Sequence, residues 1–299
     1  MKPAGETGRG PSPSQQTEPT ATGPDTENRD HHRDGEEHGD PRPATYLDLT
    51  KAVFYREYLI FVRYPADAIG GIVIALFFFS VLFFGGRMVA GQALTDSLEG
   101  IIVGYFLWTL SVGAYSSVSN DLGNEIQWGT LERHIMTPFG FAPVALLKGV
   151  AKVVRTFLTS AIILAVMLLV SGTMIRIDPL TTVVVAGLAI TSVLGLGFAA
   201  GGITVLYKQI GSWLNLLQFG FIILISAPVF DAPWTRALPL AHGSALLQRA
   251  MVDGVRLWEF TFGELALLFG VAIGYLFGGY VVFHFATRRA RRLGVLGDY

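Results

Sequence analysis

The chain has 299 residues, of which 51% are hydrophobic and only 15% are charged. Soluble domains carry about 25% charged residues, so this composition indicates a membrane protein. The net charge of -1 favours neither a nucleic acid nor an acidic partner, and the absence of cysteine excludes disulfides and thiolate metal sites.

The first 43 residues are acidic, rich in Pro, Gly, Ser and Thr, and almost without large apolar side chains. Such a segment cannot offset its own ordering entropy, so residues 1–43 are predicted to form a disordered cytoplasmic tail. It lacks the apolar core of a signal peptide. We interpret His31, His32 and His38 as solvated tail side chains and not as a metal tract.

A basic, aromatic helix is predicted from Thr45 to Pro65, before the first apolar run. Leu49, Val53, Leu59 and further apolar side chains recur there near helical spacing, between Lys and Arg residues. The pattern favours a helix on the inner membrane surface, with a solvated cytoplasmic helix as the alternative.

Six apolar stretches approach the roughly 20 residues that a membrane-spanning helix needs. They do not alternate apolar and polar residues as barrel strands do, so the predicted fold is an all-α membrane protein with six transmembrane helices. The expected spans are Ala68–Phe84, Gly100–Val118, Val153–Ile175, Leu180–Leu206, Leu214–Phe230 and Leu265–Phe285. The six-span permease domain is expected to comprise residues 44–292, followed by a cytoplasmic tail at 293–299.

The distribution of Lys and Arg gives the orientation of these spans. One set of flanking segments holds Lys51, Arg56, Arg63, Arg133, Lys148, Lys152, Lys208 and the run Arg288–Arg292. The opposite loops hold fewer cations, with acidic neighbours: Arg87, Arg176, Arg236, Arg249 and Arg256. Both termini are therefore expected in the cytoplasm, with the protein in the plasma membrane.

Ionisable residues inside a membrane are expensive and usually functional, and here the spans hold few. Arg155, near the inner end of the third span, is expected to snorkel to the interface. No pair of mid-membrane carboxylates suggests ion coupling, and no G-x-x-x-x-G-K-[ST] loop suggests an ATP site on this chain. We predict no catalytic, cofactor-binding or metal-ligating residue, and a transport role instead of an enzyme.

Glycines at helical spacing are interpreted as small-residue contacts that allow helices to approach closely. They are Gly100 and Gly104, Gly197 and Gly201, and the series Gly270, Gly274 and Gly278. The long outer segment from Asp231 to Gly263 is expected to contain short re-entrant or interfacial helices, with Leu246, Leu247, Ala250 and Met251 at helical spacing.

The loop between the second and third spans holds a charged segment, NEIQWGTLERHIMTP, at Asn124–Pro138. Trp128, Leu131 and Ile135 form an apolar stripe at i, i+3 and i+7, while Glu125 and Glu132 share another face. Such a helix suits either a groove on a cytosolic partner or the membrane surface, and the residues alone leave both open.

Two motifs in this chain resemble those of type-2 ABC exporter permeases. The loop carries Glu125, Gly129-Thr130-Leu131-Glu132, Thr137-Pro138 and Lys148-Gly149 at the family's spacing. The outer segment carries Pro239, Leu240, Arg249 and Gly254, but Leu238 stands where Asn is usual, and Ala241-His242 where Thr is common.

The resemblance covers about Thr45 to Arg292 and implies a permease subunit that a separate ATPase drives. In that family the loop is a coupling helix seated in a cleft of the ATPase subunit, which binds ATP and Mg. Glu125, Glu132 and Arg133 would make its polar contacts, and Trp128, Leu131 and Ile135 its buried anchor. A second permease copy, identical or closely related, would complete the pathway.

An amphiphilic drug or lipid-like molecule is the expected cargo, because aromatic residues abound in the spans and fixed charges do not. The nearest alternative is a polysaccharide or glycolipid exporter. Two further functional classes stay open: an ion-coupled carrier or channel, and a membrane assembly factor without transport.

Overall fold

A computed structural model describes residues 45–90, 98–127, 141–173, 175–207 and 211–292. Within these ranges the chain forms helices joined by turns, and no strand occurs, which confirms the predicted all-α class. The α-helices are α1 (Tyr46–Arg63), α2 (Pro65–Ala90), α3 (Leu98–Gln127), α5 (Phe141–Ser171), α6 (Pro179–Leu206), α7 (Gly211–Ile225), α8 (Ala241–Gln248) and α9 (Phe262–Arg292). The predicted tails 1–43 and 293–299 lie outside the described residues.

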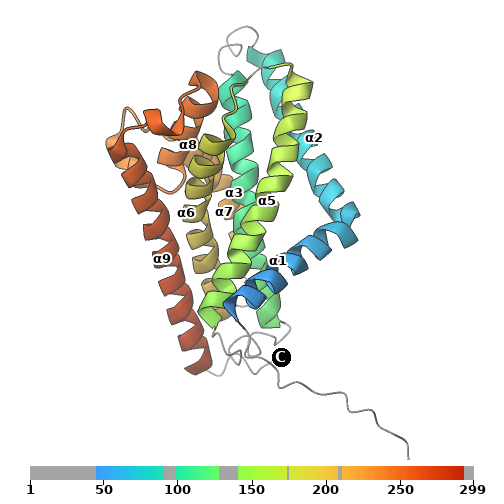
Figure 1. Ribbon diagram of the computed structural model, residues 1–299, viewed down its shortest axis with the longest axis vertical. Coiled ribbons are helices and arrows are strands. Elements are labelled where there is room, and N and C mark those ends of the chain that lie inside the picture. Colours follow the sequence, from blue (N-terminus) through green and yellow to red (C-terminus); the bar gives the residue numbers. More distant parts are fainter. Residues whose placement is uncertain (1–44, 91–97, 128–140, 174, 208–210, 293–299) are drawn as a thin grey trace, which may run out of the picture. The chain divides into compact units, whose positions relative to one another are not determined.

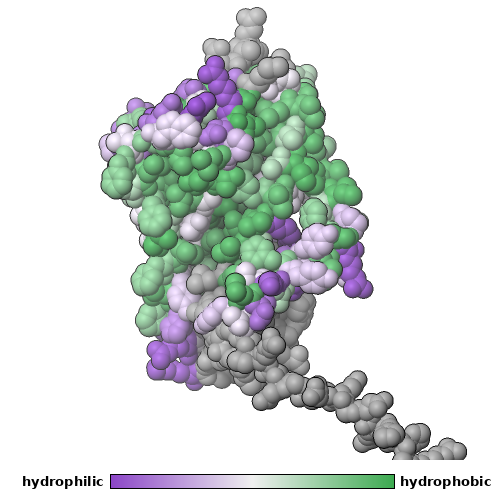
Figure 2. Space-filling model, viewed as in Figure 1, coloured by the Kyte–Doolittle hydropathy of each residue, from purple (hydrophilic) through white to green (hydrophobic). Residues whose placement is uncertain are grey.

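Five of these helices are long and apolar enough to cross a membrane. Their candidate spans are Ala68–Gly85, Leu98–Ser119, Leu147–Ser171, Pro179–Leu206 and Phe262–Ala290. On the face drawn in Figure 2, hydrophobic residues form a broad band over the helices, and hydrophilic residues gather toward both ends of the band. These features indicate a multi-pass membrane protein.

The predicted fifth span is too long, so the six-span layout is not confirmed. The corresponding helix, α7, has 15 residues and ends at Ile225. At 1.5 Å per residue it reaches about 22 Å, short of the roughly 30 Å hydrocarbon core. Pro228 disfavours the α conformation at Ala227, and the apolar Val229 and Phe230 continue in a turn.

The centre of the bundle is α6, which contacts α9 on one side and α3 on the other (Figure 1). Its residues are apolar around the whole circumference, as a fully surrounded helix requires. In the apolar stretch of α6, 61% of residues are buried, against 17% for α9 and 11% for α2. The outer helices thus present most of their apolar side chains to the surroundings, as lipid-facing helices do.

The closest helix contact joins α6 to α9 through Gly195 and Gly279. A Cβ atom on Gly279 would overlap the Gly195 carbonyl, and one on Gly195 would overlap the Tyr275 carbonyl. Two turns farther along α6, a Cβ on Gly202 would lie 2.8 Å from Phe283 Cα. Only hydrogen side chains permit backbones to come this near.

The glycines predicted for packing divide into two groups. A Cβ on Gly197 would lie 3.2 Å from Val118 Cβ on α3, and one on Gly104 would lie 3.7 Å from Ile225 Cγ2 on α7, while Gly201 is buried in α6. The other predicted positions face open space within the chain: Gly100, Gly270, Gly274 and Gly278. For α9 the prediction is corrected by one residue, because Gly279 and not Gly278 faces α6.

The predicted surface helix is α1, and its bounds confirm the expected helix. Asp48 begins it by accepting a hydrogen bond from the Thr45 backbone amide at 3.1 Å. It ends at Arg63, and Pro65 then starts α2 after a sharp change of direction (Figure 1). Most α1 side chains are exposed, whereas Val53 and Glu57 are buried on the side that packs on α5. Its position on a membrane surface stays a prediction.

Replacing Gly279 by Ala should force α6 and α9 apart and lower the unfolding free energy by roughly 1–3 kcal/mol, as overpacking does. The control is Gly274→Ala, on the same helix but in open space, where helix propensity adds up to about 1 kcal/mol of stability. Thermal unfolding of both variants in detergent checks this. Equal losses from the two substitutions would contradict the α6–α9 contact.

Candidate functional site

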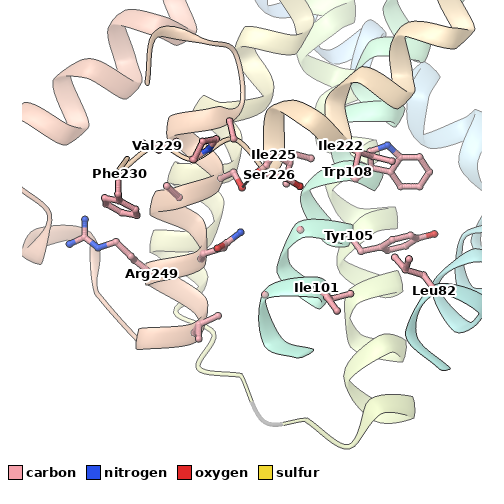
Figure 3. Close-up of a pocket in the computed structure, with 18 of the residues that line it drawn as sticks. Leu82, Ile101, Tyr105, Trp108, Ile222, Ile225, Ser226, Val229, Phe230 and Arg249 are labelled. Carbon is pink, nitrogen blue, oxygen red and sulfur yellow. Dashed lines mark hydrogen bonds between the residues drawn. The ribbon is translucent and has the colours of Figure 1, made fainter. Parts of the chain in front are cut away.

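A cavity of about 890 Å³ lies between α2, α3, α7 and the segment that follows α7. Figure 3 shows Ile101, Tyr105 and Trp108 on α3 along one side, with Phe230 and Arg249 on the opposite side. Most of the lining is apolar or aromatic. Beyond the two aromatic side chains of α3, the polar part of the lining belongs to the segment after α7 and to the short helices that follow it: Ser226, Asp231, Ser244, Gln248, Arg249 and Asp253.

A second cavity, of about 610 Å³, lies between α1, α2, α3 and α5. Phe78, Tyr105 and Trp108 line both cavities, so the two spaces adjoin along α3. The second cavity is nearer α1 and contains two cationic side chains, Lys152 and Arg155. The chain therefore has two adjoining chambers with mainly apolar walls, one next to the short helices and one next to α1.

Hydrogen bonds hold the aromatic junction between the chambers in place. The Tyr105 hydroxyl donates to the Ala75 carbonyl of α2 at 2.5 Å, and the Trp108 indole donates to the Gln218 carbonyl of α7 at 3.2 Å. The Gln218 amide in turn donates to the Ser116 hydroxyl at 3.0 Å. The two rings lie 5.4 Å apart between centroids. Side chains from α3 thus link α2 and α7 across the junction.

The outer motif (Pro239, Leu240, Arg249 and Gly254) lies in the segment of short helices between α7 and α9. Leu240, with φ 66, is a non-glycine residue in the left-handed region, and its side chain is buried in the core. The Leu240 carbonyl accepts from the Ser244 amide at 2.7 Å, and the Ser244 hydroxyl donates to the Ile225 carbonyl at 2.9 Å. Pro239, buried beside them, accepts from the Ala241 amide at 2.8 Å. These bonds fasten α8 to the end of α7.

Arg249 joins the motif to the start of α9. Its guanidinium lies 2.5 Å from the Glu264 carboxylate and 5.2 Å from the centre of the Phe260 ring. It begins a single π-helical turn, Arg249–Asp253, which ends at Gly254 with φ 76. A side chain on Gly254 would be strained by this φ and would meet Arg176 Cδ at 2.8 Å. Both motif residues therefore have a definite role in shaping this end of the chain.

The predicted coupling residues lie largely outside the described residues. Glu125 belongs to the last turns of α3, and the others fall in the stretch that the structure leaves undescribed: Trp128, Gly129, Thr130, Leu131, Glu132, Arg133, Ile135, Thr137 and Pro138. The helix of α3 continues past its apolar span, which ends at Ser119, as far as Gln127. These eight further residues extend the helix by about 12 Å beyond the span.

Arg155 contacts α1, the helix predicted to lie on the membrane surface, and its snorkelling to the interface stays a prediction. Its Nε lies 3.6 Å from the Glu57 carboxylate of α1, and Glu57 is only 5% exposed. One turn earlier, the Lys152 ammonium donates to the Ser117 carbonyl of α3 at 3.1 Å. A signal for this cluster was present in the sequence: Glu57 follows Val53 by four residues, so it lies on the face of α1 that packs on the bundle.

No family model matches this sequence, and a search of curated proteins finds no significant match. Among the described residues, no three His, Asp or Glu side chains are grouped to hold a metal ion. The site must therefore be interpreted from its own residues.

His242 should make stability depend on pH near neutrality. The ring is 5% exposed, and its Nε2 lies 3.0 Å from the Glu264 carbonyl, which requires a proton on Nε2. Burial lowers the pKa of His242, and Arg236 and Arg249 add to this, while the Glu264 carbonyl and carboxylate act in the opposite direction. Because the unfolded state takes up a proton that the folded state resists, the unfolding free energy should fall as pH drops below about 6.5.

Thermal unfolding between about pH 8 and pH 5.5 measures this dependence. The control is His242→Gln, which keeps an N–H donor but does not titrate, and which should flatten that part of the profile. An identical profile for the two proteins would show that His242 is not the group responsible.

Proposed function

We propose that this chain is the transmembrane permease subunit of an ATP-driven ABC exporter. In this role it moves an amphiphilic molecule out of the cytoplasm, and a separate ATPase subunit supplies the energy. The observation that carries the proposal is the position of the coupling-type motif. It falls between α3 and α5, two span-length helices that contact each other, and the adjoining ends of these helices lie at the opposite end of the bundle from α8 (Figure 1).

The extended end of α3 supports a mechanical role for that loop. A helix that continues beyond its span as one rigid piece transmits a push at its tip to the membrane part. Along α3 such a push reaches Trp108 and Tyr105, which stand at the junction of the two chambers. Closure of an ATPase pair on the loop would then alter the passage between the chambers.

The two chambers support an amphiphile as the cargo. Both chambers have mainly apolar walls with polar groups among them, so a molecule with a polar head and an apolar body finds partners for both of its parts. As the resemblance implies, two copies of the chain would be needed to enclose a pathway. Each copy would contribute its α2, α3 and α7 surfaces.

Replacing Glu132 by Lys should abolish stimulation of the partner ATPase. The substitution places a positive charge on the predicted acidic face of the loop and so weakens its binding to the ATPase cleft. The test coexpresses this chain with a candidate ABC ATPase subunit and measures copurification and hydrolysis. Glu259→Lys, an equal charge reversal on an exposed residue of the short helices, should leave both unchanged. Normal stimulation by the Glu132→Lys protein at wild-type abundance would overturn the proposal.

Replacing Trp108 by Ala should change which compounds stimulate hydrolysis while the complex still forms, because the ring lines both chambers. Trp108→Phe keeps an aromatic ring without the indole donor and separates stacking from the hydrogen bond to Gln218. Trp234→Ala is the control, since that ring is 71% exposed and lines neither chamber. Preferential stimulation by glycolipids would identify the carbohydrate-carrying variant of the exporter, whereas an unaltered compound profile would exclude the junction from the pathway.

A further inference from the structure

The chamber next to the short helices has aromatic side chains in its wall. Its volume of about 890 Å³ falls in the roughly 300–1,000 Å³ range of ligand pockets. Five aromatic side chains line it, from α2, α3, α7 and the turn after α7: Phe78, Tyr105, Trp108, Phe219 and Phe230. The face of an aromatic ring is apolar and also carries partial negative charge, so it attracts cations. This wall therefore suits an apolar molecule that bears a positive charge.

Two carboxylates, those of Asp231 and Asp253, belong to the same lining. Asp231 lies in the turn after α7, Asp253 ends the π-helical turn, and both residues are exposed. Among the described residues neither carboxylate has a hydrogen-bond or ion-pair partner. A ligand in this chamber would thus meet two negative charges that no contacting side chain neutralises.

The one cation that the described lining contains, Arg249, already has partners. Its guanidinium lies 2.5 Å from the Glu264 carboxylate, which is outside the lining, and 5.2 Å from the centre of the Phe260 ring. In Figure 3 it points away from the side chains of α3. The other cations between α7 and α9, Arg236 and Arg256, do not belong to the lining. The two aspartates are therefore the unpaired charges of this chamber.

The direction of α7 adds to the negative potential of the chamber. The helix ends at Ile225, and Ile225, Ser226 and Ala227 line the cavity. The aligned backbone dipoles of a helix leave partial negative charge at its C-terminal end, where cations are stabilised. The aromatic faces, the two carboxylates and the end of α7 thus favour the same sign of ligand charge, although they come from different parts of the chain.

We propose that the chamber next to the short helices binds lipophilic cations, which combine an apolar or aromatic body with one positive centre. The body lies against the rings of α2, α3 and α7, and the positive centre lies toward Asp231 and Asp253. That such a cation is the cargo rests on the proposed function, whereas its binding to the chamber does not.

Methyltriphenylphosphonium and triphenylphosphine oxide test this charge preference directly. Both carry three phenyl groups on phosphorus, but the first is a cation and the second is neutral. Equilibrium dialysis of the purified full-length chain in detergent, with protein-free micelles as the blank, measures the two dissociation constants. We expect the cation to bind about tenfold more tightly than the oxide. The preference is no larger because both carboxylates are exposed and solvent screens them.

The double variant Asp231→Asn with Asp253→Asn keeps the size of both side chains and removes their charge. It should weaken binding of the cation about tenfold and leave binding of the oxide nearly unchanged. Phe230→Leu keeps an apolar side chain without the ring face, and should weaken the cation about threefold more than the oxide. The matched control is Glu259→Gln, which removes a charge from an exposed residue between α7 and α9 that does not line the chamber. All four positions are exposed, so the substitutions should leave the fold intact.

A tenfold preference that the double variant loses and Glu259→Gln retains would support the proposal. Equal binding of the cation and the oxide to the unaltered protein would refute it, and so would a preference that survives in the double variant. An equal loss in Glu259→Gln would also refute it, because the preference would then arise from general surface charge. These measurements need no ATPase subunit, so their failure is distinguishable from a failure of the Glu132→Lys experiment.

Discussion

The backbone contact between α6 and α9 is the constraint on which the arrangement of the other helices depends. Because Gly195 and Gly279 bring the two helices almost into backbone contact, α6 is covered on one side by a single long helix. Its other side receives α3, and Gly197 accommodates Tyr115 and Val118 there. In a membrane, where apolar surface gains little by leaving lipid, such shape fit and dispersion are the main sources of helix association.

The tight packing on one flank contrasts with looser packing on the other. α3 contacts α2 and α7 through a few large aromatic side chains and single hydrogen bonds, and both chambers occupy this flank. Contacts made by side chains with rotatable bonds can rearrange, whereas a glycine-to-backbone contact has no such freedom. The α6–α9 contact therefore leaves less freedom for adjustment than the contacts of α3 with α2 and α7.

Local patterns in the sequence predicted the helices well but not all their ends or contacts. The helical spacing of its apolar residues and the position of Pro65 predicted α1, whereas α7 was extended too far because Val229 and Phe230 are apolar although they follow Pro228. The repeat Gly270, Gly274, Gly278 has the right spacing for a helix contact, yet the neighbouring Gly279 makes it. A rotation of about 100° separates adjacent residues on a helix, and only the position of α6 decides between them. The chambers depend on where helices fail to meet, which no local pattern encodes.

The shortness of α7 has a consequence for the membrane around it. The helix stops about 8 Å before a bilayer of ordinary thickness would end. Backbone carbonyls of the turn beyond it have partners: Ser244 and Arg236 donate to the carbonyls of Ile225 and Val229, and the Ala232 amide donates to that of Pro228. Polar chain could therefore lie below the level of the lipid headgroups at this place without leaving these carbonyls unpaired. The hydrocarbon layer beside α7 would then be effectively thinner than around the longer helices.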